Sequence, residues 1–442
     1  MVKLAKPFSR LGSGKALVIG DLILDTYTLG NVTRISPEAP VPVLHVSEEK
    51  SRPGGAGNVA LSLVALGMEV IAVGRVGGDL AGRELKEQLV NYKVNTGGIV
   101  EEEGYQTPLK KRVIAGTQQI VRVDYEKITP LTQSFEQLLI EHIPNLLEDV
   151  KVVAISDYGK GFLTPVLLKA FIEAARERSI PVIVDPKGTS FAKYMGVTVL
   201  KPNLAEARIA ARLGSQASLE EVAAKIFEDS AAEILLITKS ENGISVFHRD
   251  SGYHSDFPVK VKEVNDVTGA GDTVLAMLAC AFASDLSISD AAQLANIAAG
   301  VAIEHMGCVH VTKTQIAQRL LEYDVVNKVY EEDHLHAVQE ILQDRRYRVL
   351  GLKCNEGLTP LIFESICKLS RSSEFELILY VCDKQLDEKF VSMLASMREV
   401  SLIIIKGESL RRLCDRITPE EVFLIENGEM VQIEHMDALL QN

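Results

Sequence analysis

The chain has 442 residues, of which 47 are basic and 60 acidic, so its formal net charge is −13. This length exceeds one ordinary domain, and we expect two. The excess of acid argues against general nucleic-acid binding, which needs a basic face, but leaves room for a local basic pocket that binds an anionic small molecule.

The N-terminal segment, residues 1–15, lacks the apolar run of a signal peptide, and no apolar stretch approaches the ~18 residues of a membrane helix. The six cysteines include no CxxC pair, and most lie in apolar runs, which favours free thiols in a reducing compartment. We therefore expect a cytoplasmic protein without a membrane partner.

Short apolar strands alternate with amphipathic helices from the first residues of the chain. A strand is predicted at 15–21 (KALVIGD), a helix at 58–67 (NVALSLVALG) and another strand at 69–77 (EVIAVGRVG). This alternation predicts βαβ units and a mostly parallel sheet. Ligands of such sheets bind beyond the carboxyl ends of the strands, where several polar residues fall: Asp21, Asp157, Asp185, Asn203 and Lys239.

Two regions depart from this pattern. Residues 26–50 and 107–127 alternate polar and apolar residues with no helix between close strands, which predicts an antiparallel flap beside the main sheet. Such a flap could serve as a lid, as a dimer surface or as both. Strand edges at 41–47 (VPVLHVS) and 110–116 (KKRVIAG) need covering, so we expect a homodimer formed through the flap.

The strand–helix pattern restarts after about residue 325, with strands expected at 347–354, 375–383 and 400–407. We therefore predict two domains, 1–325 and 330–442, the second being a small Rossmann-like α/β domain.

A glycine-rich turn, Gly269-Ala270-Gly271, precedes an apolar helix. Such a turn exposes backbone N–H groups that, together with the helix dipole, form a hole suited to a phosphate. Asp272 follows directly and would repel a bound phosphate, so we interpret it as a general base that takes a proton from an attacking hydroxyl. The alternative is an aspartate that only caps the helix. No GxxxxGK[ST] phosphate loop occurs in the chain.

A second glycine-rich run surrounds Gly54 and Gly55 and leads into a helix near Asn58. Bare backbone with one asparagine suits the close approach of a ligand rich in hydroxyls. The alternative is a turn and helix start without a ligand.

Residues 52–82 and 263–273 resemble the two signatures of the ribokinase-like (pfkB) sugar kinases. The string KPNLAE (201–206) resembles the Asn-x-x-Glu element of that family, and LLITKSENGISVF (235–247) resembles its nucleotide-side strand and turn. The resemblance covers about residues 10–320. It implies a three-layer α/β sandwich with a β-flap lid, and a kinase that uses ATP and Mg²⁺.

Within the family, the strings at 20–44, 118–126, 156–161 and 185–191 resemble the heptose 7-phosphate kinases, which form one half of a bifunctional enzyme of ADP-heptose synthesis. The resemblance implies phosphorylation of D-glycero-D-manno-heptose 7-phosphate at its anomeric hydroxyl, in lipopolysaccharide core biosynthesis. Two alternatives stay open: a kinase of this fold for another sugar or sugar phosphate, and a non-catalytic sugar-phosphate sensor.

The family pattern assigns roles position by position. It makes Asp272 the base and Gly269, Ala270 and Gly271 the anion hole. The expected ATP and magnesium residues, with the metal near the first two, are Asn203, Glu206, Thr238, Lys239, Gly243, Asp266 and Asn296. The expected substrate residues are Asp21, Asp25, Arg34, Gly54, Gly55, Asn58, Lys110, Arg112, Asp157, Lys160 and Lys187.

Four of these substrate residues, namely Lys110, Arg112, Lys160 and Lys187, are cations on flap or strand-end loops. Four cations around one mouth of an acidic protein favour a phosphorylated substrate, although each alone could be a solvated surface charge. The pattern does not say which of them holds the phosphate. Arg122 and Asp124 could be substrate contacts or a cross-strand ion pair, and we favour the pair.

The second domain departs from the bifunctional enzyme. That enzyme carries an HxGH motif just after the first strand of its transferase domain, whereas this chain reads LGLKCNEGLTPLIFES at 350–365, with His334 and His336 only upstream. We interpret residues 330–442 as a nucleotidyltransferase-like domain without activity. An unrelated regulatory α/β domain is the alternative.

Overall fold

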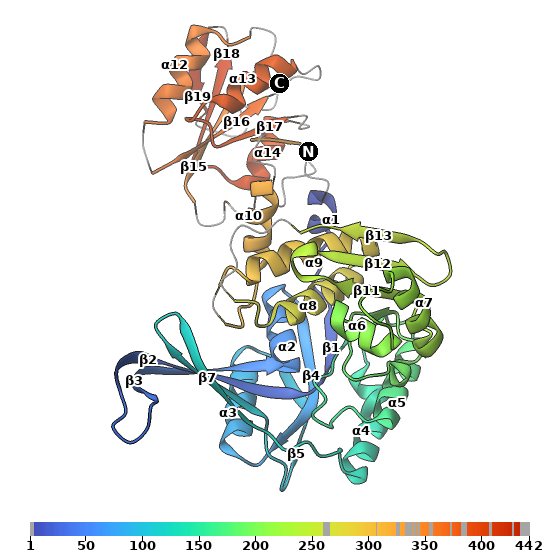
Figure 1. Ribbon diagram of the computed structural model, residues 1–442. Coiled ribbons are helices and arrows are strands. Elements are labelled where there is room, and N and C mark those ends of the chain that lie inside the picture. Colours follow the sequence, from blue (N-terminus) through green and yellow to red (C-terminus); the bar gives the residue numbers. More distant parts are fainter. Residues whose placement is uncertain are drawn as a thin grey trace. The chain divides into compact units, whose positions relative to one another are not determined.

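The protein is described by a computed structural model that divides into two compact units, Leu11–Thr312 and Met1–Arg10 with Lys313–Asn442 (Figure 1). The division falls before α10 (Lys313–Tyr323), earlier than the boundary near residue 325 that the sequence pattern indicates. The described residues are 4–259, 266–305, 307–323, 328–331, 339, 342, 345–352, 357–371, 374–381, 387–405, 409–426 and 428–433.

The larger unit is built on a nine-stranded sheet in the order β13-β12-β11-β10-β9-β8-β1-β4-β5. Its strands are β1 (Lys15–Gly20), β4 (Glu69–Gly77), β5 (Asn95–Glu102), β8 (Val150–Ser156), β9 (Val182–Asp185), β10 (Val199–Leu200), β11 (Ile234–Thr238), β12 (Ile244–His248) and β13 (His254–Phe257). All neighbours pair in parallel except β11–β12 and β12–β13. The inner strands are buried on both faces, as expected of apolar runs under helices.

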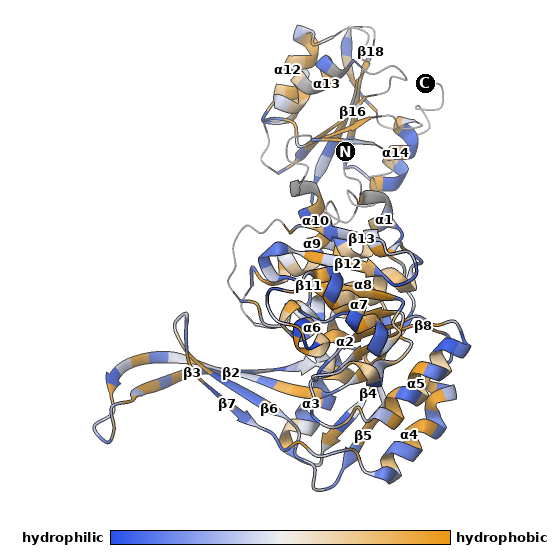
Figure 2. Cartoon of the chain, turned by 45° about the vertical axis from the view of Figure 1, so that its right-hand side comes forward, coloured by the Kyte–Doolittle hydropathy of each residue, from blue (hydrophilic) through white to orange (hydrophobic). Residues whose placement is uncertain are grey.

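Helices cover both faces of this sheet (Figure 1). One face carries α2 (Ala56–Ala65), α8 (Ala270–Ala283) and α9 (Ile288–Ala302), and the other α4 (Gln133–Leu146), α5 (Pro165–Glu177), α6 (Leu204–Ala211) and α7 (Leu219–Ser230). The helix α3 (Leu80–Asn91) packs on β5 and on the base of the flap. Hydrophobic and hydrophilic residues alternate along α4 and α5, as in helices that bury one face (Figure 2).

A separate four-stranded sheet, in the order β3-β2-β6-β7, forms the flap. Its strands are β2 (Leu22–Ile35), β3 (Pro42–Gly55), β6 (Leu109–Ala115) and β7 (Gln118–Tyr125). The two hairpins are antiparallel, but β2 pairs with β6 in parallel, so the expectation of a wholly antiparallel flap is wrong. The physical reason is that β2 and β6 follow β1 and β5, two parallel strands, and therefore leave the main sheet in the same direction.

The smaller unit has a six-stranded sheet in the order β14-β17-β16-β15-β18-β19, parallel except for the β18–β19 pair. Its strands are β14 (Val329–Glu331), β15 (Tyr347–Leu352), β16 (Glu376–Val381), β17 (Leu402–Ile405), β18 (Glu421–Glu426) and β19 (Glu429–Gln432). Besides α10, the helices whose bounds fall within the described residues of this unit are α1 (Ala5–Ser9), α12 (Pro360–Leu369), α13 (Glu388–Ser396) and α14 (Leu410–Ile417). Residues 353–356, the expected HxGH position, and His334 and His336 lie outside the described residues.

In the described part of the chain, no helix combines the length and apolarity needed to cross a bilayer. The cysteines Cys280, Cys308, Cys367 and Cys414 are free thiols, as expected, while Cys354 and Cys382 lie outside the described residues.

Candidate active site

The start of α8 forms the centre of the candidate site. Gly269 precedes the helix with a φ of 79°, and no side chain caps the first turn. A Cβ atom on Gly269 would lie 2.9 Å from Asn58 Nδ2 and 3.3 Å from Cys308 Sγ, so only glycine fits both the backbone conformation and the space. The Ala270 N–H donates to the Val267 carbonyl at 3.3 Å, so of the expected anion hole the N–H of Gly271, with that of Asp272 and the helix dipole, is left without a capping side chain.

Asp272 lies in this first turn and is 2% exposed. Its Oδ2 accepts a hydrogen bond from Asn58 Nδ2 at 2.8 Å, and its Oδ1 accepts one from the Tyr158 hydroxyl at 2.9 Å. Because the side chain makes these contacts, the capping alternative does not describe it. Burial raises the pKa of Asp272 to about 7, even though both hydrogen bonds lower it. A carboxylate with this pKa can accept a proton near neutral pH.

A buried ion pair, which sequence reasoning missed, lies beside the same turn. Lys201 Nζ is 2.9 Å from Asp185 Oδ2. A Cβ atom on Gly271 would lie 3.7 Å from that Nζ and 3.6 Å from that Oδ2. The available signal was a lysine directly after the short strand β10, which places its ammonium at the carboxyl end of the sheet. Lys201 thus places a fixed positive charge beside the first turn of α8, in a chain that has no phosphate-loop lysine.

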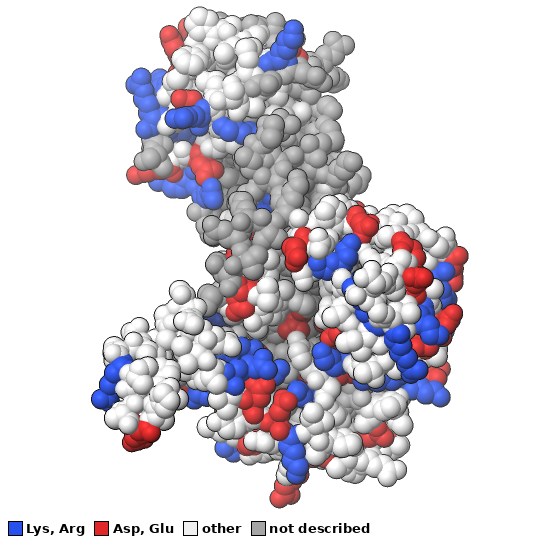
Figure 3. All heavy atoms as spheres, in the orientation of Figure 1, with Lys and Arg blue, Asp and Glu red and all other residues white. Residues whose placement is uncertain are grey.

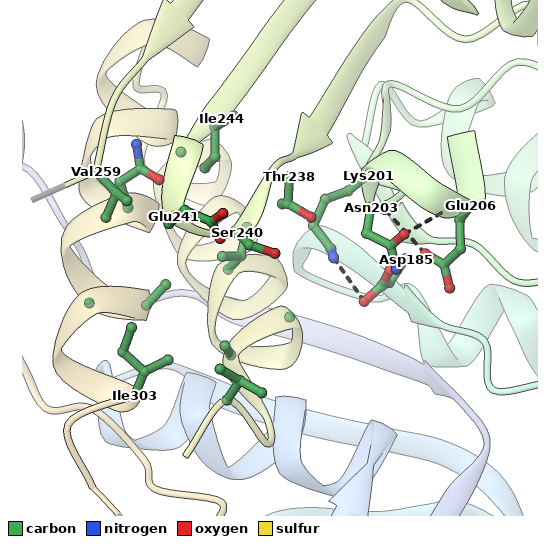
Figure 4. A pocket seen from close by; sticks show the side chains of 18 of the residues that line it. Asp185, Lys201, Asn203, Glu206, Thr238, Ser240, Glu241, Ile244, Val259 and Ile303 are labelled. Atoms are coloured by element: carbon green, nitrogen blue, oxygen red, sulfur yellow. Dashed lines mark hydrogen bonds and ion pairs between the residues drawn. The ribbon is translucent and has the colours of Figure 1, made fainter. Parts of the chain in front are cut away.

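A pocket of about 510 Å³ opens next to Lys201. One wall is apolar, with Ile244, Val259 and Ile303, while the other carries Asp185, Lys201, Asn203 and Glu206 (Figure 4). Thr238, Gly243 and Asn296, three of the residues that the resemblance assigns to the nucleotide, also line it. An apolar wall opposite a polar one suits a flat aromatic base joined to phosphates.

Two of the expected nucleotide residues have other contacts. Lys239 Nζ pairs with Asp256 Oδ1 at 2.5 Å and is absent from the pocket lining. Asp266 accepts hydrogen bonds from the Thr268 backbone and hydroxyl and from Gly307 N, which shapes the turn before α8. We read both as supports of neighbouring segments.

Asn203 and Glu206 form a capping box at the start of α6, in which each side chain accepts a hydrogen bond from the other residue's backbone N–H. The second carboxylate oxygen of Glu206 accepts from Lys187 Nζ at 2.8 Å. Lys187 therefore lies with Glu206 at the pocket rather than with the flap cations. Within the described residues, no group of three or more His, Cys, Asp or Glu side chains is spaced to hold a metal ion.

Magnesium needs fewer protein ligands than such a group supplies, because it keeps several waters and takes substrate phosphate oxygens. The carboxylates of Glu206 and Asp185 line the pocket beside the anion hole. This donor set, hard oxygens next to the space for phosphates, fits the ion.

A further group of expected site residues lies at the base of the flap and in the loop 157–161, whose Tyr158 contacts Asp272. Asp21 Oδ2 accepts from the backbone N–H groups of Tyr158 and Lys160, at 2.9 and 3.0 Å, and burial raises the pKa of Asp21. Asp157 accepts from Lys193 Nζ and from the Tyr194 hydroxyl, both at 2.6 Å. Both carboxylates thus have protein partners that fix this loop.

Asp25 lies at the base of β2, where Arg112 NH1 donates to its Oδ1 at 2.5 Å. A Cβ atom on Gly54 would lie 2.0 Å from Asp25 Oδ2, and Gly55 has a φ of 57°. The two glycines therefore make room for the Asp25 carboxylate and for the turn into α2, which carries Asn58.

The expected basic residues divide into separate groups. Lys160 Nζ pairs with Glu126 at 2.6 Å, while Lys110 forms no ion pair with a described residue. Burial, followed by the nearby charge of Lys160, lowers the pKa of Lys110. Arg34 is exposed on the distal part of β2, away from this cluster. Basic and acidic side chains gather around the base of the flap (Figure 3).

Arg122 and Asp124 form a bidentate ion pair, with N–O distances of 2.8 and 3.0 Å. The pair is therefore confirmed, but it joins two residues of the same strand, β7, rather than two strands. Residues two apart on a strand share a face, which allows this contact.

Comparison with known proteins agrees with this arrangement. The family model of the pfkB family carbohydrate kinases matches residues 14–315. The chain belongs to this family of carbohydrate kinases.

The particular relatives are more specific. The bifunctional protein HldE of Trichlorobacter lovleyi is 46% identical over 311 residues, which cover 70% of this chain and 63% of that protein. HldE of Geobacter metallireducens is 46% identical over 303 residues, which cover 68% of this chain and 62% of the relative. The matched region therefore spans less than two thirds of the length of these relatives.

Solved structures show the same fold in the kinase region. Phosphofructokinase-2 from Escherichia coli in complex with potassium superposes with a TM-score of 0.58 at 20% identity, covering 71% of this chain and 99% of its own. Ribokinase of Arabidopsis thaliana, complexed with ribose and ATP, gives a TM-score of 0.55 at 16% identity, covering 70% and 99%. The expected ribokinase-like α/β fold is confirmed.

Proposed function

We propose that this chain is an ATP-dependent kinase that phosphorylates D-glycero-D-manno-heptose 7-phosphate at its anomeric hydroxyl, giving the 1,7-bisphosphate for ADP-heptose synthesis. The identity with HldE proteins over the kinase region supports this choice of sugar. One observation carries the proposal of catalysis. The buried Asp272, with a pKa raised to about 7, lies in the first turn of α8, directly after Ala270 and Gly271, which line the 510 Å³ pocket.

The proposed reaction needs one proton acceptor and a set of positively polarised groups that stabilise the transferring phosphoryl group. Asp272 takes the proton of the anomeric hydroxyl as its oxygen bonds to the γ-phosphorus of ATP. The bond from that phosphorus to the β,γ-bridging oxygen breaks, and ADP leaves. The first-turn N–H groups of α8 and the ammonium of Lys201 stabilise the negative charge of the transferring group.

The pocket is the proposed ATP site, with the base against Ile244, Val259 and Ile303 and the phosphates toward Lys201. Glu206 and Asp185 would hold Mg²⁺ there, Asn203 fixing Glu206 through the capping box. Bound magnesium would neutralise part of the phosphate charge.

For the phosphate of the sugar, Lys110 is the best candidate among the four cations. Arg112 is neutralised by Asp25, Lys160 by Glu126 and Lys187 by Glu206. Lys110, half-buried beside Lys160, forms no ion pair with a described residue, and the attraction of Asp25 and Asp124 does not offset burial and the charge of Lys160. A phosphate dianion would relieve the repulsion between the two ammonium groups.

We also propose that the flap forms a homodimer. The expectation of a strand edge at 110–116 is wrong, because these residues lie in and directly after β6, an inner strand of the flap, whose edge strands are β3 and β7. The edge strand β7 exposes Val121, Val123 and Tyr125, which lie on one face because they alternate along the strand. An exposed apolar edge strand is otherwise an aggregation hazard. Sedimentation at micromolar concentration should show a dimer, and a monomer would rule this surface out.

The kinase proposal is tested by ADP release with a panel of sugar 7-phosphates and 6-phosphates, each with ATP and Mg²⁺. Heptose 7-phosphate should give the highest kcat/KM. A higher value for another sugar phosphate would reassign the substrate within the family. Binding without any turnover across the panel would favour a sugar-phosphate sensor.

A further inference from the structure

The loop 157–161 is held in place from three directions. Asp21 Oδ2 accepts from the N–H groups of Tyr158 and Lys160, and Gly159 N donates to the loop's own Asp157 at 2.7 Å. Asp157 N also donates to the Asp185 carbonyl at 3.1 Å, which joins the loop to the end of β9. These bonds fix the backbone on both sides of Tyr158.

The third hold comes from Arg75, at the end of β4, whose side chain is 1% exposed. Its NH2 donates to the carbonyl of Lys160 at 3.2 Å and to that of Thr129 at 2.7 Å, and its NH1 pairs with Glu102 at 2.8 Å. A buried network of this kind resists displacement, because moving one member leaves charged groups without partners. The loop is therefore a rigid support rather than a mobile segment.

Tyr158 is the residue that this support presents to the site. Its hydroxyl donates to Asp272 Oδ1, and its ring lies under Lys110, with Nζ 5.5 Å from the ring centroid. Asn58 donates to the other oxygen, Oδ2. The two donors come from different segments, and together they fix the rotation of the carboxylate about its Cβ–Cγ bond.

We propose that Tyr158 is a positioning residue for the base: its hydroxyl orients the Asp272 carboxylate and stabilises the ionised form that accepts the substrate proton. This inference rests on the proposed kinase function. Tyr158 also links this role to the proposed phosphate subsite, since its hydroxyl contacts Asp272 and its ring packs against the Lys110 ammonium. A sugar phosphate held by Lys110 therefore meets a base whose orientation is already set.

Other groups around Asp272 do not duplicate this role. Asp185 and Lys201 act through their charges from the ends of β9 and β10, raising and lowering the pKa of Asp272 respectively. Cys308 is nearby, and burial raises the pKa of its thiol to about 12, so it stays neutral. Tyr158 and Asn58 are the side chains that donate hydrogen bonds to the carboxylate in the described structure.

The test compares Tyr158→Phe with Tyr194→Phe. The first removes the hydroxyl on Asp272, while the second removes a hydroxyl that supports the same loop through Asp157 and does not touch the base. With the best sugar phosphate of the panel, Tyr158→Phe should lower kcat about tenfold, leave the sugar KM within about twofold, and move the acid limb of the rate profile upward by about one pH unit. Tyr194→Phe should leave the acid limb in place.

An unchanged kcat and acid limb in Tyr158→Phe would overturn the proposal, and so would an equal shift in both variants. A second readout needs no substrate and separates this inference from the kinase proposal. Loss of the hydroxyl should raise the pKa of Asp272, so that the fall in melting temperature with rising pH extends to higher pH. This difference should vanish when Asp272→Asn is added to both proteins. If it persists there, Tyr158 does not act through Asp272.

Discussion

Asn58 at the start of α2 donates a hydrogen bond of 2.8 Å to Asp272 at the start of α8, across 214 positions of sequence. The bond joins the two glycine-rich runs of the chain. Gly269 makes it possible, because any Cβ there would press on Asn58 Nδ2. Each run therefore supplies half of one site, and the following predictions test what that site does.

Asp272→Asn should reduce kcat on the order of 10³-fold, because an amide cannot accept the proton of the sugar hydroxyl. Binding of ATP and sugar, measured by calorimetry, should stay close to that of the parent protein. A variant that keeps more than roughly a tenth of the parent rate would remove Asp272 from the role of base.

The activity should depend on pH through the same group. Since the pKa of Asp272 is raised to about 7, kcat/KM should fall as the pH drops below that value. A profile that is flat from pH 8 to pH 5 would contradict this assignment.

The free energy of unfolding should depend on the same ionisation of Asp272, but it should fall with rising pH where the activity rises. In the unfolded chain the pKa of this carboxyl returns toward 3.8, so between there and about 7 the folded state binds more protons. The free energy of unfolding therefore loses the contribution of this group as the pH rises through that window. Asp272→Asn cannot titrate at this position. The melting temperature of this variant, relative to that of the parent, should therefore increase as the pH rises from 4 to 8.

Lys201→Met should lower kcat about a hundredfold, because it removes the buried cation beside the anion hole. Lys187→Met is the matched control, since Lys187 lines the same pocket but is 52% exposed. It should cost less than about fivefold, because exposed charges are screened by water. If Lys201→Met fails to fold, the double variant Lys201→Met with Asp185→Asn should restore folding, and its rate should stay well below that of Asp185→Asn alone, which lacks the same proposed magnesium ligand. Equal losses of kcat in Lys201→Met and Lys187→Met would show that Lys201 contributes no more to catalysis than an exposed cation of the same pocket.

Glu206→Gln should raise the magnesium concentration needed for half-maximal rate, because it removes a charge while its amide oxygen can still complete the capping box. Glu221→Gln is the control, because Glu221 occupies the same capping position in α7 away from the pocket. A magnesium titration at fixed ATP measures the difference. Matching curves for Glu206→Gln and the parent would refute the metal assignment.

The smaller unit should have no nucleotidyltransferase activity, because the chain contains no HxGH motif to stabilise charge on the nucleotide phosphates. Heptose 1-phosphate and ATP should yield no ADP-heptose, as followed by chromatography. Ending the chain after Thr312, where the larger unit ends, should leave the kinase reaction largely intact. Formation of ADP-heptose would overturn this interpretation. A fragment that folds but is inactive would show that the smaller unit belongs to the kinase.

Local patterns in the sequence were enough to predict the sheet, and they drew attention to the Gly269–Gly271 turn and to Asp272 as candidates for an anion hole and a base. The strand at 69–77 is β4 with the same bounds, because an apolar run between turns has few other ways to be buried. The Gly269–Gly271 turn predicted a helix start for a similarly local reason. The backbone N–H groups at such a start are not covered by side chains and can bind an anion. Asp272 drew attention because a carboxylate beside an expected phosphate site would repel the phosphate, which is acceptable only if the carboxylate has a chemical role.

Only the tertiary structure decided which charged residues meet. Lys187 was grouped with the flap cations, but its side chain reaches Glu206, and Lys239 was assigned to the nucleotide yet pairs with Asp256. Lys201 and Tyr158 went unassigned, because their positions depend on burial and on partners from other elements, Asp185 for Lys201 and Asp272 for Tyr158. Sequence shows that a charge is present, but the direction of a long side chain depends on packing between segments far apart in the chain, and that packing exists only in the folded protein.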